Sequence, residues 1–233
     1  MTALRKSWHF ASLGLGLVLL VIGHGLGLFV APEEAMMGNV GRILYVHVPT
    51  AWVALVTYLI AFVLACGSLW TSRRGWDAGT EAAVEVGVLL NALLLCQGSI
   101  WAKPTWDTWW TWDPRLTTTA IMVVTFVGVL VLRSLVHRPS RRAMATAVAT
   151  IIAFVNVPIV YKSVEWWNSL HQEFSSPDTV SDPMILPLRV AAFGMLFISI
   201  GLIGWRASIG VKRLAAEDTP DALPDAPKPL ELS

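Results

Sequence analysis

The sequence predicts an all-α integral membrane protein with six transmembrane helices and tryptophan-rich loops on one side of the membrane. Of its 233 residues, 55% are hydrophobic and only 14% are charged, whereas about a quarter of the residues in a soluble domain are charged. The mean hydropathy is +0.61. One soluble core of this size could not bury so much apolar surface, and the same hydrophobicity excludes a disordered chain.

Six apolar runs are long enough to cross a bilayer, which takes about 20 residues in a helix. Barrel strands would instead alternate in segments of about ten residues. The first run is too long for the core of a cleaved signal peptide, so we expect it to remain as a helix. Pro158 lies inside the fifth run and predicts a kink there. The six runs cover residues 10–30, 51–71, 82–100, 117–136, 143–161 and 185–205.

The distribution of lysine and arginine predicts the orientation of these helices. Of the 17 Lys and Arg residues, twelve fall on the side of both termini and four in the loops on the other side, with Arg189 in the last run. Both termini are therefore expected in the cytoplasm, with loops near 31–50, 101–116 and 162–184 facing the periplasm of a bacterium. We expect residues 1–213 to form one membrane domain, and 214–233, rich in Pro, Asp and Ala, to form a disordered cytoplasmic tail.

Composition also excludes several classes of function. Two cysteines, both inside predicted helices, rule out a disulfide-stapled module and a Cys-x-x-Cys-His haem attachment site. A net charge of +1 gives no reason to expect nucleic acid. The chain has no phosphate-binding loop, so any ATP hydrolysis must come from a partner, and no catalytic residue is identified.

The tryptophans are concentrated on the outward side. An aromatic belt would place them at both interfaces, and this alternative stays open. The densest stretch is Trp106-Asp-Thr-Trp-Trp-Thr-Trp-Asp113. If it is helical, Trp106, Trp109, Trp110 and Asp113 share one face with Trp112 beside them, which makes an indole surface suited to a large planar ligand. Of the 12 tryptophans, seven lie in the outward loops: Trp101, Trp106, Trp109, Trp110, Trp112, Trp166 and Trp167.

Asp113 also has a structural interpretation. It precedes Pro114, and Asp-Pro is a favourable N-cap and first-turn pair for a helix that starts at Arg115. This capping role leaves room for a second role in positioning the loop.

Two histidines flank the tryptophan loop on the outward side. His47 lies where the chain enters the second span, and His171 lies in the last outward loop. If the fifth helix continues beyond the membrane, Trp167 and His171 share a face. Each histidine alone fits a hydrogen-bonded surface residue. A third, His24, is inside the first span, where it fits either a functional group or an interfacial one.

Two neutral imidazoles beside a broad aromatic surface are what a haem uses, because its iron takes axial histidine nitrogens and its porphyrin stacks on aromatic rings. Haem propionates need cations or hydrogen-bond donors. Arg115, Lys103, Arg42 and Lys162 are the candidates, although such side chains also snorkel at interfaces.

The segment from Trp101 to Thr117 resembles the "WWD" signature of haem-handling membrane proteins. Together with Tyr45-Val-His-Val-Pro-Thr-Ala-Trp52 and Glu165-Trp-Trp-Asn-Ser-Leu-His-Gln172, it resembles the cytochrome c maturation protein C (CcmC) family of haem exporters. The similarity covers about residues 1–210 and includes the loop order. The family's glycine after the first Trp is Ala102 here.

This resemblance implies a concrete function. The family presents haem, here haem b, at the outer face of the bacterial inner membrane and passes it to a periplasmic haem chaperone, without being an enzyme. The implied partners are an ATP-binding cassette complex of two further maturation proteins and a small single-span protein. By resemblance, the axial ligands are His47 and His171, and the porphyrin is cradled by Trp106, Trp109, Trp110, Trp112 and Asp113.

Two other functions compete with this one. A b-type haem oxidoreductase linked to quinol would place its ligands within the spans, where only His24 lies. A transporter would need polar groups near the midplane, for which Glu81, Glu85 and Arg189 are the candidates.

Overall fold

A computed structural model describes residues 4–171 and 180–217, and within these ranges the chain is almost entirely helical, without β-strands. Six helical segments are long and apolar enough to cross a membrane, as predicted. A short π-helix, Leu26–Val30, and a short 3-10 helix, Asn39–Ile43, flank the first outward loop. The α-helices are α1 (Leu4–Gly25), α2 (Leu44–Thr71), α3 (Arg74–Trp106), α4 (Pro114–Leu135), α5 (Pro139–Phe154), α6 (Asn156–Trp166) and α7 (Asp182–Glu217).

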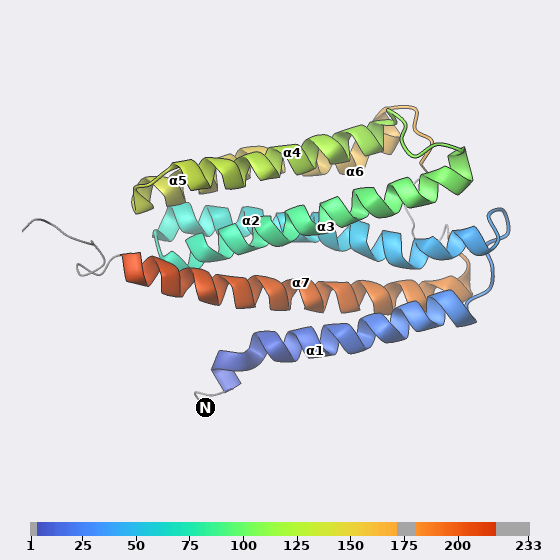
Figure 1. Ribbon diagram of the computed structural model, residues 1–233, viewed down its shortest axis with the longest axis horizontal. Coiled ribbons are helices and arrows are strands. Elements are labelled where there is room, and N and C mark those ends of the chain that lie inside the picture. Colours follow the sequence, from blue (N-terminus) through green and yellow to red (C-terminus); the bar gives the residue numbers. More distant parts are fainter. Residues whose placement is uncertain (1–3, 172–179, 218–233) are drawn as a thin grey trace, which may run out of the picture.

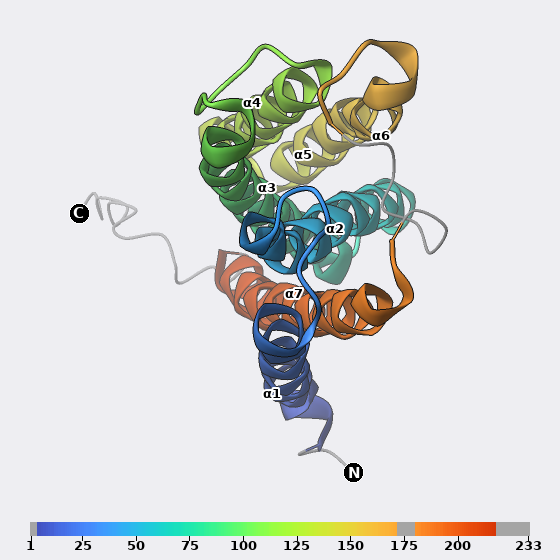
Figure 2. The same ribbon diagram turned by 90° about the vertical axis from the view of Figure 1, so that its right-hand side faces the viewer.

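The helices lie along one axis, and successive spans alternate in direction (Figure 1). α7 lies between α1 and the pair α2 and α3, while α4, α5 and α6 cover the other side of that pair. The start of α1 and the end of α7 are at the same end of the bundle. Figure 2 views the molecule from the opposite end, which is called the outer end below.

Several helices extend beyond the apolar windows that predicted them. The second begins at Leu44 instead of 51, and the third runs from Arg74 to Trp106 instead of 82–100. Hydropathy marks only the part of a helix that faces lipid, so polar turns that continue it escape detection. α7 likewise continues to Glu217, within the predicted tail, and residues 218–233 lie outside the described ranges.

The fifth span is interrupted as Pro158 predicts. α5 ends at Phe154 and α6 begins at Asn156, with a turn at Val155. Proline has no N–H to donate to the carbonyl four residues earlier, which here belongs to Phe154. The break therefore lies where the hydrogen bond is lost.

α1 packs closely on α7 because glycines line their contact. A Cβ at Gly23 would lie 2.4 Å from the Ala191 nitrogen, and one at Gly16 would lie 2.7 Å from the Ile198 nitrogen. Small residues of this kind let membrane helices approach backbone to backbone.

An ion-pair network joins α3, α4 and α7 at the inner end. The guanidinium of Arg133 donates to both carboxylate oxygens of Asp77, at 2.7 and 3.1 Å. Glu81 pairs with Arg133, at 3.2 Å, and with Arg213, at 2.6 Å, and Glu85 pairs with Arg206 at 2.7 Å. Glu81 and Glu85, the acidic candidates for a transport site, are thus engaged in ion pairs that hold the bundle together.

Candidate functional site

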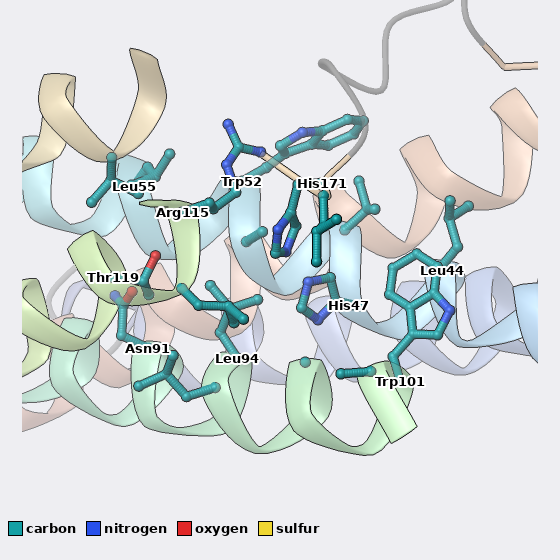
Figure 3. Close-up of a pocket in the computed structure, with 18 of the residues that line it drawn as sticks. Leu44, His47, Trp52, Leu55, Asn91, Leu94, Trp101, Arg115, Thr119 and His171 are labelled. Atoms are coloured by element: carbon teal, nitrogen blue, oxygen red, sulfur yellow. The ribbon is translucent and has the colours of Figure 1, made fainter. Parts of the chain in front are cut away.

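A cavity of about 250 Å³ lies between α2, α3, α4 and α6 toward the outer end. Most of its lining is apolar, from residues such as Leu55, Leu94 and Met122. The two outward histidines, His47 and His171, both line it (Figure 3). The other polar or aromatic lining residues are Trp52, Asn91, Trp101, Thr105, Trp106, Arg115, Thr119 and Tyr161.

His47 lies in the first turn of α2 and is partly buried. Its ring meets the edge of Trp101, with centroids 5.4 Å apart and planes at 71°. On the neighbouring α3, a Cβ at Gly98 would make an ordinary contact of 3.4 Å with His47 Cε1, so Gly98 lies directly beside the imidazole. The Nδ1 atom of His47 is buried and has no hydrogen-bond partner among the described residues. A buried polar atom without a partner is costly, and this side of the imidazole therefore lacks the support of a hydrogen bond.

The tryptophan loop is not helical, so the expectation that four of its residues share a helix face is wrong. α3 ends at Trp106 because Asp107 adopts the left-handed conformation, with φ of 55°, and Lys103 binds the Asp107 carbonyl at 3.0 Å and its carboxylate at 2.7 Å. At the other end, Pro114 disfavours the helical conformation for Asp113. Residues 107–113 form an irregular loop between these two stops.

The tryptophans between Trp106 and Asp113 separate into two groups. Trp106 lines the cavity and its ring meets His171 edge-on, with centroids 5.1 Å apart. Trp109, Trp110 and Trp112 do not line the cavity. The rings of Trp110 and Trp112 contact each other edge to face, with an angle of 86° between their planes. The Trp112 side chain is 81% exposed.

Trp52 and Trp101 line the cavity, although the sequence interpretation did not assign them to the ligand surface. Trp52 is five residues beyond His47 and Trp101 is five residues before Trp106. Their position within the same two motifs was the available signal.

Asp113 caps α4, as predicted, and also holds His171. Its Oδ1 accepts the Arg115 amide at 2.9 Å and lies 3.1 Å from His171 Nδ1. Its Oδ2 accepts the Ser169 hydroxyl at 2.8 Å and the Leu170 amide at 2.7 Å. One carboxylate therefore joins the tryptophan loop to the last outward loop.

These contacts set the charges of both groups. Burial by itself would raise the pKa of the Asp113 carboxyl, but hydrogen bonds from Ser169 and Leu170 and the nearby His171 bring that pKa below its usual value. Burial lowers the pKa of His171, and the attraction of Asp113 offsets only part of that change. At neutral pH the carboxylate is charged and the imidazole is neutral, with a lone pair available to a metal.

His171 reaches the cavity by a route that differs from the predicted one. α6 ends at Trp166, and Trp167 is extended, with φ of −132°. Trp167 and His171 therefore do not share a helix face, and that expectation is wrong. The hydrogen bonds of the Asp113 carboxylate replace the helix as the device that places the imidazole. Gln172, the last residue of this motif, lies outside the described ranges.

Of the four outward cations, Arg115 lines the cavity beside the histidines, and it also donates to the Tyr161 carbonyl at 3.2 Å. Arg42 binds the carbonyls of Gly27, Leu28 and Ala31, which end the π-helix. Lys103 pairs with Asp107, and Lys162 pairs with Glu165 at 2.8 Å. The structure thus distinguishes Arg115 from three cations with local structural roles.

His24 does not line the cavity. It is hydrogen-bonded to the backbone of Tyr45, whose carbonyl receives no helical hydrogen bond because Pro49 has no N–H. This local contact favours the interfacial role of His24 over the functional one.

The cavity can hold a metal that brings most of its own ligands. No group of three or more His, Cys, Asp or Glu side chains with metal-binding geometry occurs in residues 4–171 or 180–217. Two imidazoles are too few for a closed zinc site but are sufficient for a haem iron, which takes axial ligands from the protein. Apolar walls, indoles and one guanidinium suit the porphyrin and its propionates.

Comparison with known proteins agrees with this chemistry. The family model described as heme exporter protein C matches residues 1–219. A heme exporter protein C from Haemophilus influenzae is 38% identical over 81% of this chain and 78% of the relative. Proteins of the same name from Bradyrhizobium diazoefficiens and Escherichia coli K12 are 34% and 35% identical, over 83% and 79% of this chain and 77% and 76% of the relatives.

Proposed function

The chain belongs to the heme exporter protein C (CcmC) family, and on that basis we propose that it holds haem b, as cargo, between His47 and His171 and delivers it to a periplasmic haem chaperone. It is a multi-pass membrane protein with a role in haem handling for cytochrome c maturation. What this proposal adds is the site, the orientation and the direction of transfer.

The observation that carries the proposal is the meeting of two distant histidines in one cavity. His47 lies in the first turn of α2 and His171 follows α6, yet both line the same apolar space together with Arg115. Two histidines that line one cavity, with His171 neutral at physiological pH, fit the needs of axial ligation. Trp101 contacts the His47 ring and Trp106 contacts the His171 ring, both edge-on. These contacts would limit the rotation of the two imidazoles.

The remaining tryptophans of the proposed ligand surface would serve the transfer of haem to the partner. Trp109, Trp110 and Trp112 lie outside the cavity, and two of them are mostly exposed, Trp109 at 59% and Trp112 at 81%. Exposed indoles would offer a partner an apolar surface on which a porphyrin can pass from one protein to the other. Arg115 would bind a propionate through charge-assisted hydrogen bonds.

The excess of lysine and arginine at the end that holds both termini supports a cytoplasmic location for that end. The outer end would then face the periplasm of a bacterial inner membrane. The chain's own residues bind, orient and release haem in this proposal and carry out no bond-making step. ATP hydrolysis and the release of the loaded chaperone would be tasks of an ATP-binding cassette complex and a small single-span protein.

The test is the haem content and absorption spectrum of the purified full-length protein. We expect wild-type protein to show a spectrum of two-histidine ligation, and the double variant His47→Ala/His171→Ala to lose the haem and to stop loading the chaperone. His137→Ala, at an exposed histidine of the inner end, is the matched control and should retain both. Full haem content in the double variant would overturn the ligand assignment.

The same preparation separates the proposal from a b-type electron-transfer protein. A carrier gives up its haem when the apo-chaperone is added. An oxidoreductase would keep its haem and become reduced when quinol is supplied.

A further inference from the structure

The two cavity histidines differ in what supports them. His171 Nδ1 is 3.1 Å from a carboxylate oxygen of Asp113. His47 Nδ1 is buried and has no hydrogen-bond partner within the described part of the chain. Residues that the proposed function treats as a pair therefore have different donor strengths.

The carboxylate behind His171 is held in place by other groups. The Asp113 side chain is only 1% exposed. Besides His171 it accepts hydrogen bonds from the Ser169 hydroxyl and from the amides of Leu170 and Arg115. These donors fix the position and the charge of the carboxylate, so its contact with the imidazole does not depend on a mobile side chain.

A carboxylate that accepts the Nδ1 proton has a known effect on a histidine ligand. It fixes the tautomer, leaves the Nε2 lone pair for the metal and increases its basicity. An imidazole without such a partner is a weaker donor. Because His47 is also fixed on a transmembrane helix, it cannot follow a cargo that moves outward.

We propose that Asp113 is a positioning residue that makes His171 the stronger, retained ligand, and that His47 is the weaker ligand, which lets go first during transfer. This inference rests on the proposed function, because it ranks the two ligands named there. In this proposal the tryptophan loop and the last outward loop, which carry Asp113 and His171, hold the cargo. The contact from His47 on α2 is the one that breaks.

Single variants test the ranking. Full-length protein is loaded with haem and mixed with an excess of a haem-scavenging apo-globin, and the rate of haem loss is followed. We expect His47→Ala to retain its haem with an altered spectrum and His171→Ala to lose it at least tenfold faster than His47→Ala. Equal rates, or faster loss from His47→Ala, would overturn the ranking.

Asp113→Asn tests the positioning role, and asparagine still serves as an N-cap for α4. We expect haem loss to become about 10- to 100-fold faster, the range typical when a group that hydrogen-bonds a metal-binding histidine is changed. The haem reduction potential should rise because the ligand donates less. In the His171→Ala background the same substitution should change neither quantity, which a purely structural role would not predict.

Asp107→Asn in the same loop is the control, because Asp107 contacts Lys103 and does not line the cavity. An unchanged potential and rate in Asp113→Asn would exclude the positioning role.

If the double histidine variant kept a wild-type spectrum and full haem, the ligand assignment itself would fail. If that variant lost its haem but the single variants behaved alike, only the ranking would fail.

Discussion

The Asp113 carboxylate and the His171 imidazole lie 3.1 Å apart although 58 positions separate them in the sequence. The same carboxylate caps α4 and binds the backbone of the last outward loop. The start of a transmembrane helix and the position of a candidate ligand thus depend on one buried group. A disturbance of this junction should be measurable at the haem site.

The Ser169 hydroxyl provides a way to weaken this junction without touching a ligand. It donates to Asp113 Oδ2 at 2.8 Å and accepts the His171 amide at 3.1 Å. We expect Ser169→Ala to lower haem affinity about tenfold or more, because a hydrogen bond to a charged group contributes about 1.5–3 kcal/mol. Haem titration of purified protein measures the change. The two-histidine spectrum should persist at saturation, and Ser140→Ala, at an exposed serine of the inner end, should bind haem as the wild type does.

Arg115 should recognise the propionates of the cargo. We expect Arg115→Ala to weaken haem binding by about 10- to 100-fold, the equivalent of about 1.5–3 kcal/mol for charge-assisted hydrogen bonds, and to leave the spectrum unchanged. The dimethyl ester of haem provides the sharper measurement. Wild-type protein should prefer free haem to the ester, and Arg115→Ala should bind both alike.

A control for this experiment is Lys162→Ala. Lys162 is paired with Glu165 and does not line the cavity. If the arginine variant still preferred free haem over the ester, or if Lys162→Ala lost the preference, the propionate assignment would be wrong.

Gly98 keeps space open beside His47. A Cβ there would make an ordinary contact of 3.4 Å with His47 Cε1, so Gly98→Ala should keep haem binding and gain helix stability of about 1 kcal/mol or less. Gly98→Leu should fill the space next to the imidazole and abolish haem binding in protein that still inserts. Haem content per inserted molecule is the measurement. Gly128→Leu, at a glycine of α4 with nothing within 4 Å of its Cβ position, should have no effect on it.

Alanine substitutions in the two groups of tryptophans should have different effects on haem binding and haem transfer. Trp106 packs on His171, so Trp106→Ala should lower the haem content of the purified protein. Trp112 is exposed outside the cavity, so Trp112→Ala should keep its haem but load the chaperone more slowly. Trp70→Ala, at a tryptophan of the inner end that is 90% exposed, should change neither the haem content nor the rate of chaperone loading. Loss of haem from Trp112→Ala would place that side chain in the binding site.

The sequence was sufficient to predict the features that depend on local composition. Six apolar runs predicted six spans because hydrophobicity must be continuous across lipid, and Asp113 before Pro114 predicted a cap because both groups act within one turn. The loop 107–113 was misjudged because a helical periodicity was assumed for residues whose ends are fixed by Asp107 and Pro114. The contact between Asp113 and His171 needs loops from two different hairpins to meet, and no short-range pattern encodes that.

The network at the inner end makes a prediction about stability alone. Arg133 is buried and binds Asp77 with two hydrogen bonds, and it also pairs with Glu81. Arg133→Met would leave the Asp77 carboxylate buried and unpaired, which typically costs about 3–5 kcal/mol. We expect that loss in the free energy of unfolding in detergent, with unchanged haem affinity of the folded fraction, because the cavity lies at the other end of the bundle.

Removing the second charge tests the cause of that loss. In Arg133→Met/Asp77→Leu the buried carboxylate is gone, and Glu81 keeps its ion pair with Arg213. Replacement of both partners of a buried ion pair by apolar residues is often neutral, so the double variant should recover much of the lost stability. Arg141→Met, at an exposed arginine nearby, should change stability little. If the double variant were no more stable than Arg133→Met alone, the loss would come from the packing of the arginine side chain and not from the orphaned charge.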